Sequence, residues 1–186
     1  MKPLRIAVLA SGRGSVIPRI IEAINDKQLN AKIEIIISNK TDADVLKLAE
    51  NHNIEAQYIP SEQLISQTLK QHNVDLILSI GYMKILSHTF VDEWRNKILN
   101  VHPSLLPAFA GLMDLEVHRA VLEAGVKETG CTVHLVTEKV DAGPILLQKK
   151  CLVHKADTPQ TLKQRVQKLE GEALVEAIKK WQEKYG

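Results

Sequence analysis

Residues 6–15 read IAVLASGRGS and join a short apolar run to a loop that contains two glycines. Continuous apolarity over so few residues is typical of a strand that is covered on both faces, as in a parallel sheet. We expect a helix next, with Ser15 as its N-cap and Pro18 in its first turn, where a missing N–H costs little. Its apolar residues repeat with helical spacing: Val16, Ile17, Ile20, Ile21 and Ile24.

The same alternation of strand and helix continues through the first hundred residues. Short strands are expected at 33–37, 57–59, 74–80 and 98–101, with helices at about 43–52 and 61–72. Strands that alternate with helices of about ten residues predict βαβ units and a parallel sheet.

The pattern changes after a helix expected at 115–124. Strands at 130–136 and 145–153 are joined by a connection that is too short for a helical crossover, so we expect them to be antiparallel. An amphipathic helix is expected at 158–181. The sequence therefore predicts a single α/β domain over residues 1–186, with a Rossmann-like, mostly parallel sheet flanked by helices and an antiparallel strand pair near the C-terminus.

Composition excludes several classes of protein. The 186 residues contain 24 Lys and Arg against 22 Asp and Glu, a formal net charge of +2, which is too balanced for a dedicated nucleic-acid binder. The charged fraction of 25% is ordinary for a globular protein and argues against disorder. No apolar run of 18 residues indicates a membrane span, and the chain enters its first strand without a signal-peptide pattern. Cys131 and Cys151 lack CxxC spacing and are expected to be reduced packing residues. We expect a cytoplasmic protein without nucleic-acid or membrane partners, and the formation of a homodimer is left open.

The loop at 11–15 is the first candidate binding element. It lies between the first strand and the first helix, where glycines let the backbone approach an anion and a helix N-terminus offers free N–H groups. It matches neither the GxGxxG dinucleotide signature nor the P-loop. A small phosphate group is the favoured ligand, and the alternative is a simple tight turn.

The stretch at 100–107, NVHPSLLP, is the most distinctive in the chain. Asn100 and His102 are two residues apart at the end of a strand, so their side chains can point the same way. An amide donor beside an imidazole suits acyl-type transfer, because the amide can stabilise an oxyanion while the histidine moves a proton. Asp141 lies in a turn between the last two expected strands. It either bonds its own backbone or orients His102 and favours its protonated form, and spacing leaves both open.

The other histidines do not form a metal-site pattern. Four of them are expected on the surface, namely His52, His72, His88 and His154. The remaining three, His102, His118 and His134, are evenly spaced 16 residues apart, and no HxxH or HExxH occurs. We therefore expect no zinc site.

Four stretches together resemble the phosphoribosylglycinamide formyltransferases of the folate-dependent formyltransferase family. They are residues 100–107, 81–86 (GYMKIL), 130–134 (GCTVH) and 140–144 (VDAGP). The resemblance runs from about residue 4 to 180. It implies an enzyme of de novo purine (IMP) biosynthesis that transfers a formyl group from 10-formyltetrahydrofolate, as cosubstrate, to the amine of 5′-phosphoribosylglycinamide (glycinamide ribonucleotide). It implies neither a metal nor a nicotinamide.

The resemblance also assigns site residues. It implies that His102, Asn100 and Asp141 form a catalytic trio that stabilises a tetrahedral intermediate. It implies contact with the ribonucleotide phosphate and ribose by Gly12, Arg13, Gly14, Ser15 and Glu170. It implies a folate site that includes Asn100 and is formed by Met83, Lys84, Ile85, Leu86, Thr137, Glu138, Lys139, Val140 and Asp141.

This chain departs from the family pattern at several positions. Val16 replaces a common Asn, Gly171 a common His and Lys84 a frequent Arg, and the 61–72 stretch is shorter than usual. Methionyl-tRNA formyltransferases share the Asn-x-His loop but add a nucleic-acid-binding domain, and we expect none here. The alternatives are a formyltetrahydrofolate deformylase-like hydrolase and a non-catalytic folate- or nucleotide-binding relative.

Overall fold

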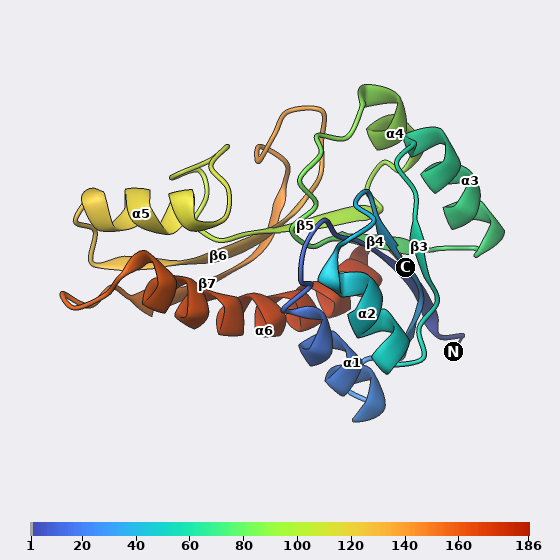
Figure 1. The fold of residues 1–186 in the computed structure, drawn as a ribbon, viewed down its shortest axis with the longest axis horizontal. Coiled ribbons are helices and arrows are strands. Elements are labelled where there is room, and N and C mark those ends of the chain that lie inside the picture. Colours follow the sequence, from blue (N-terminus) through green and yellow to red (C-terminus); the bar gives the residue numbers. More distant parts are fainter. Residues whose placement is uncertain (1) are drawn as a thin grey trace. The chain divides into compact units, whose positions relative to one another are not determined.

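A computed structural model describes residues 2–186, which form two compact units, one ending at Asn100 and the other spanning Val101–Gly186 (Figure 1). The first unit contains β1 (Leu4–Leu9), α1 (Ile17–Asn25), β2 (Ala31–Ser38), α2 (Asp44–Asn51), β3 (Ala56–Tyr58), α3 (Glu62–Gln71), β4 (Leu76–Ser79), α4 (His88–Glu93) and the first residues of β5 (Ile98–His102). The second contains the end of β5, then α5 (Leu115–Glu123), β6 (Glu128–Leu135), β7 (Ile145–Leu152) and α6 (Pro159–Tyr185).

The strands of the first unit follow the order β3-β2-β1-β4-β5, and every pairing is parallel. Val8 of β1 lies between Ile36 of β2 and Leu78 of β4, and all three side chains are fully buried. β1 therefore needs apolar residues on both faces, which is why the run IAVLA is continuous rather than alternating.

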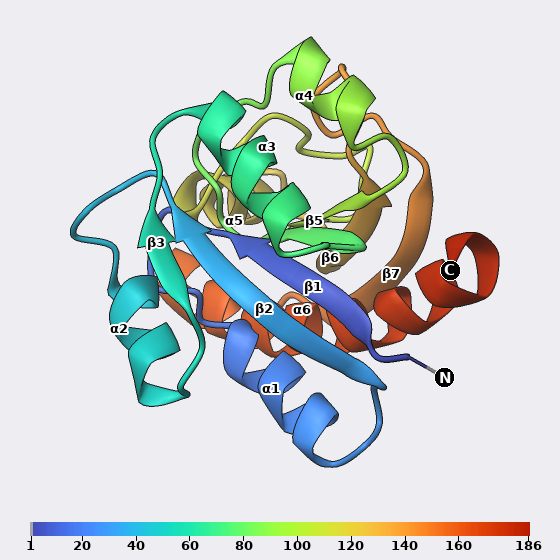
Figure 2. The same cartoon turned by 90° about the vertical axis from the view of Figure 1, so that its right-hand side faces the viewer.

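The direction of strand addition reverses at β1. The chain adds β2 and β3 on one side through α1 and α2, and α3 returns it to β4 on the other side (Figure 2). In such sheets the crevice beyond the strands' carboxyl ends at this reversal is where ligands bind. The loops after β1 and β4 meet there, since Ser11 N–H donates to the Gly81 carbonyl over 3.1 Å.

The second unit contains the antiparallel pair. β6 and β7 pair with Thr132 opposite Gln148, and β6 is the neighbour of β5 in the strand order. α6 packs along both strands (Figure 1). α5 packs against α6. The Thr158 side chain accepts from Thr161 N–H and forms a capping box, so the helix begins where its capping residue predicts. The predicted α/β class, with a mostly parallel sheet and an antiparallel pair, is confirmed.

Two local features differ from the sequence-based expectation. The N-cap of α1 is Val16, not Ser15, and no side chain caps the helix. The backbone supplies the contact instead, because Ile17 N–H donates to the Gly14 carbonyl over 2.9 Å. The six-residue α4 was not predicted, since it is too short for helical periodicity to show. Within residues 2–186, no helix has the length and apolarity needed to cross a membrane.

A substitution at Gly130 tests the close approach of β6 and β7. A Cβ at this position would lie 1.8 Å from the Lys149 carbonyl oxygen, a backbone atom that cannot rotate away. We expect Gly130→Ala to lower the free energy of unfolding by about 3 kcal/mol, measured by urea denaturation. Gly125→Ala is the control, because a Cβ there meets open space and only the positive φ of 63° is unfavourable, at about 1 kcal/mol. Equal losses in both variants would contradict the packing assignment.

Candidate active site

β5 carries two of the predicted catalytic residues. Ser79 of β4 pairs with Asn100, which fixes the register of the strand at this point. His102 follows two residues later, so both side chains project from the same side of the strand. Asn100 is half-buried and His102 is buried, as expected for polar groups at the carboxyl end of an internal strand.

A carboxylate lies between two imidazoles in the second unit. Asp141 Oδ2 is 3.3 Å from His102 Nδ1, and Asp141 Oδ1 is 3.5 Å from His134 Nε2. All three side chains are less than a tenth exposed. His134 Nδ1, the other ring nitrogen, lies 2.9 Å from the Leu135 carbonyl oxygen. The Asp141 side chain therefore contacts both imidazoles, which is the arrangement that an orienting role would require.

The loop between β5 and α5 contacts both members of the His102–Asp141 pair. The Phe109 carbonyl oxygen lies 3.1 Å from His102 Nε2, and Gly111 N–H donates to Asp141 Oδ2 over 2.9 Å. Thr132 Oγ1 fixes the start of this loop, because it donates to the Ser104 carbonyl over 2.7 Å and accepts from Leu106 N–H over 3.0 Å. Backbone groups of the loop therefore complete the polar surroundings of the pair.

Opposing effects set the charges of the pair. Burial lowers the pKa of His102, and the Asp141 carboxylate and Phe109 carbonyl raise it, leaving a net value below the ordinary one. Burial raises the pKa of Asp141, but hydrogen bonds from His134 and Gly111 and the nearby histidine charges outweigh it, so the net pKa falls. Asp141 favours the protonated form of His102, but desolvation is the larger effect on the pKa of that histidine.

The predicted phosphate loop lies in the first unit. Ser11 Oγ donates to Asn39 Oδ1 over 2.6 Å and accepts from Met83 N–H over 2.8 Å, so it joins this loop to the stretch after β4. Gly14 has φ +63°, and a Cβ there would lie 2.6 Å from Ile17 Cδ1 and 2.7 Å from Val45 Cγ2. Only glycine fits this turn. The other three loop residues, Gly12, Arg13 and Ser15, are exposed.

The predicted folate residues form two exposed segments, one in each unit. In the first unit, Met83 and Ile85 are among the most exposed large apolar side chains, and Lys84 Nζ donates to the Pro60 carbonyl over 3.4 Å. Leu86 completes this segment and is half-buried.

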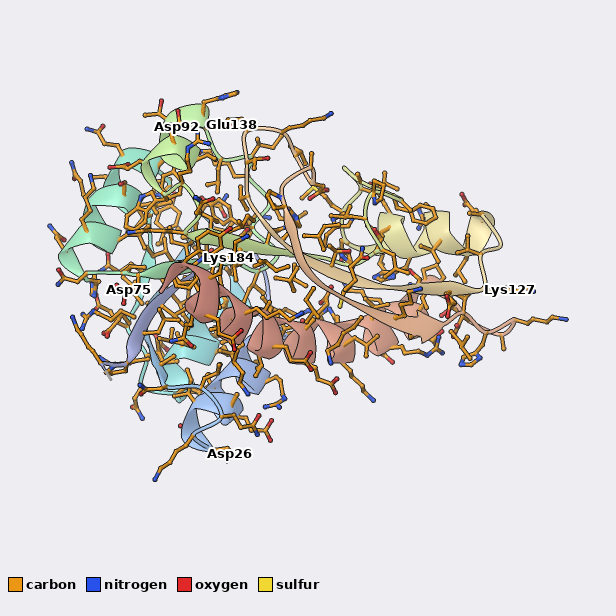
Figure 3. The ribbon with its side chains drawn as sticks, turned by 180° about the vertical axis from the view of Figure 1, so that it is seen from behind. Asp26, Asp75, Asp92, Lys127, Glu138 and Lys184 are labelled. Atoms are coloured by element: carbon orange, nitrogen blue, oxygen red, sulfur yellow. The ribbon has the colours of Figure 1, made fainter. Side chains whose placement is uncertain are left out.

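In the second unit, residues 137–141 lie in the connection between β6 and β7. Figure 3 shows Glu138 in this connection and Lys127 at the other end of β6. Thr137 Oγ1 donates to the Lys139 carbonyl over 3.2 Å, and Val140 is half exposed. The carboxylate of Asp141, by contrast, is turned into the protein.

Glu170 lies on α6 and is buried, and burial raises its pKa to about 7, partly opposed by the charge of Lys163. A carboxyl group with this pKa can accept or donate a hydrogen bond near neutral pH. Gly171, its neighbour, is also buried.

Sequence reasoning gave no site role to His134 or to the backbone groups of Phe109 and Gly111, and it included Ser11 only as part of the candidate phosphate loop. His134 was considered only as a metal ligand. Its place at the end of the strand before the Asp141 turn was the available signal, because a short hairpin brings the ends of its strands together. Among the described residues, no group of three or more His, Cys, Asp and Glu side chains is arranged to hold a metal.

Comparison with known proteins identifies the family of the chain. The Formyl transferase family matches residues 4–178 of the chain. The phosphoribosylglycinamide formyltransferase of Bacillus subtilis is 36% identical over 184 residues, which cover 94% of this chain and 93% of that protein. A crystal structure of phosphoribosylglycinamide formyltransferase from Brucella melitensis superposes with a TM-score of 0.89 at 38% identity and covers all of this chain and 97% of its own.

A longer relative matches over one part only. The trifunctional purine biosynthetic protein adenosine-3 of Gallus gallus is 41% identical over 184 residues, which cover 94% of this chain. The chain spans 18% of the length of that relative.

Glu170 gives a testable pH dependence. Its folded pKa of about 7 lies above the ordinary 4.5, so the stability tied to its neutral form is complete below pH 4.5 and is lost as the pH rises through 7. We expect Glu170→Gln to remove about 3 kcal/mol of that pH-dependent change in the free energy of unfolding. Urea denaturation at pH 4.5 and pH 8 measures it, with the exposed Glu183→Gln as control. Parallel pH profiles for wild type and Glu170→Gln would contradict the burial of this carboxyl group.

Proposed function

The chain belongs to the formyl transferase family, and from this we propose that it transfers a formyl group from 10-formyltetrahydrofolate to the amine of 5′-phosphoribosylglycinamide, in purine biosynthesis. Relatives that match over nearly their whole length and carry the phosphoribosylglycinamide formyltransferase name support this acceptor over water, the acceptor of a deformylase. The observation that carries the chemistry is the buried pair of His102 Nδ1 and Asp141 Oδ2, 3.3 Å apart.

In this proposal His102 is the catalytic acid and base. The substrate amine attacks the formyl carbon, a C–N bond forms, and negative charge develops on the formyl oxygen. Protonated His102 stabilises that charge, and Asn100 donates a second hydrogen bond to it. As the bond from the formyl carbon to the folate nitrogen breaks, protonated His102 transfers its proton to that nitrogen. The neutral His102 then takes up the proton that the attacking amine loses, which restores its protonated form.

Asp141 acts on His102 rather than on the substrate. Its carboxylate holds Nδ1, which leaves Nε2 as the ring nitrogen for proton transfer. The low ground-state pKa of His102 is compatible with this role, because developing negative charge on the formyl oxygen raises it during the reaction.

The proposed binding roles follow the positions that match the family's motifs. We assign the ribonucleotide phosphate and ribose to Gly12, Arg13, Gly14, Ser15 and Glu170. We assign the folate to Asn100, Met83, Lys84, Ile85, Leu86, Thr137, Glu138, Lys139, Val140 and Asp141. The exposed apolar surface of Met83 and Ile85 supports the folate assignment, since an aromatic ligand would cover it. The buried Val16 side chain cannot donate a hydrogen bond, so phosphate binding depends on backbone N–H groups and Arg13.

The folate keeps its oxidation state in this reaction, so the proposed chemistry requires neither a nicotinamide nor a metal. The cytoplasmic location and the absence of nucleic-acid partners stay predictions, and homodimer formation stays open.

An assay with and without the acceptor tests the reaction. Purified protein with 10-formyltetrahydrofolate and 5′-phosphoribosylglycinamide should give formylated ribonucleotide and tetrahydrofolate in equal amounts, and no formate. Formate released without the acceptor would show a hydrolase. Ligand binding without turnover would show a binding module, and either result overturns the proposal.

Replacing His102 tests the catalytic assignment. We expect His102→Ala to lower kcat by about 10²–10⁴-fold, because the acid–base group is lost, with a smaller change in KM. His154→Ala is the control, since this histidine is exposed in the second unit and should leave kcat unchanged. A kcat within a few-fold of wild type for His102→Ala would contradict the role of His102.

A further inference from the structure

The loop between β5 and α5 covers the reactive side of His102. Nδ1 of this histidine faces Asp141, so only Nε2 can meet a substrate. In the structure Nε2 faces the Phe109 carbonyl oxygen at 3.1 Å. A carbonyl oxygen already occupies the place beside Nε2 that the proposed reaction needs for the formyl oxygen.

The far end of this loop is held by an ion pair. Asp114, the N-cap of α5, pairs with the ammonium group of Lys163 on α6. The Asp114 backbone has φ +51° and ψ −127°, a combination that is unfavourable for a residue with a side chain and persists only where surrounding contacts hold it. The Lys163 side chain is 18% exposed and the Asp114 side chain 55%, so water screens the pair mainly on the side of the carboxylate.

The loop is therefore fixed at both of its ends and in the middle. Thr132 forms hydrogen bonds with residues 104 and 106, and Asp141 forms one with Gly111. Lys163 forms an ion pair with Asp114. The Lys163–Asp114 pair contacts neither His102 nor Asp141, and unlike the buried Thr132 its two side chains are partly exposed. Replacing Asp114 therefore leaves His102, Asn100 and Asp141 in place, whereas replacing Lys163 also removes a charge that lowers the pKa of Glu170.

We infer that Lys163 is a positioning residue: its ion pair with Asp114 holds the Phe109 carbonyl on His102 Nε2, where it takes the place of the formyl oxygen until the donor displaces it. The inference rests on the proposed formyl transfer. Holding the loop in this position reduces the fraction of protein that is ready to bind the formyl group, and the apparent affinity falls by that fraction.

Lys163→Met tests the inference through the binding of the formyl donor. Loss of a partly exposed ion pair should raise the fraction of open loop about twofold to fivefold. We expect the Kd of 10-formyltetrahydrofolate, measured without acceptor by equilibrium dialysis, and its KM to fall by that factor, with kcat unchanged. The Kd of tetrahydrofolate should not change, because it lacks the formyl oxygen that competes with Phe109.

Further variants separate this role from a merely structural one. Asp114→Asn should give the same gain as Lys163→Met, and the two together no more than either alone. The exchanged pair Lys163→Asp with Asp114→Lys should restore the wild-type Kd. Lys179→Met, at an exposed site on the same helix, should have no effect.

Each result decides the inference. An unchanged Kd in both single variants, an equal gain for tetrahydrofolate, or a fall in kcat with constant KM would overturn it. If Lys163→Met lowers thermal stability, Asp114→Asn in the exposed loop provides the same test. A wild-type protein without formyl transfer would instead overturn the proposed function, whereas the Kd comparison can still be made without turnover.

Discussion

A buried carboxylate must be surrounded by donors, and much of the second unit satisfies this constraint for Asp141. One oxygen faces His102 and accepts from Gly111, and the other faces His134. These partners come from the end of β5, the end of β6 and the loop before α5. Because an unpaired buried charge costs several kcal/mol, the short connection between β6 and β7 has to return Asp141 to this position.

The helices and strands that could be predicted are those whose burial produces a regular pattern of apolar residues in the sequence. Strands such as β1 and β4 are buried on both faces and show as unbroken apolar runs, and the long α6 shows its cap and its apolar stripe. The start of α1 was not predictable from side chains. Because Gly14 has a positive φ, its carbonyl accepts from Ile17 N–H, and no Ser15 side-chain cap forms. The six residues of α4 contain too few turns to give a period.

The site was predictable in its side chains but not in its backbone groups. Asn100, His102 and Asp141 stand out because amide, imidazole and carboxylate groups are uncommon near the ends of apolar strands. The Phe109 carbonyl and the Gly111 N–H leave no trace in sequence, since every residue but proline carries both groups. Spacing likewise did not predict that burial would lower the pKa of His102 despite Asp141, because desolvation depends on what packs around the ring.

The contrast between Gly12 and Gly14 has a consequence for how this loop can change over evolutionary time. A methyl group at Gly12 meets nothing within 4 Å, whereas at Gly14 it collides with two neighbouring side chains. The path of the loop thus depends on the glycine at position 14. The side chains at its neighbours can change without a steric clash of this kind. A lineage could alter the charge or size of what this loop touches at residues 12, 13 and 15 while its path stays the same.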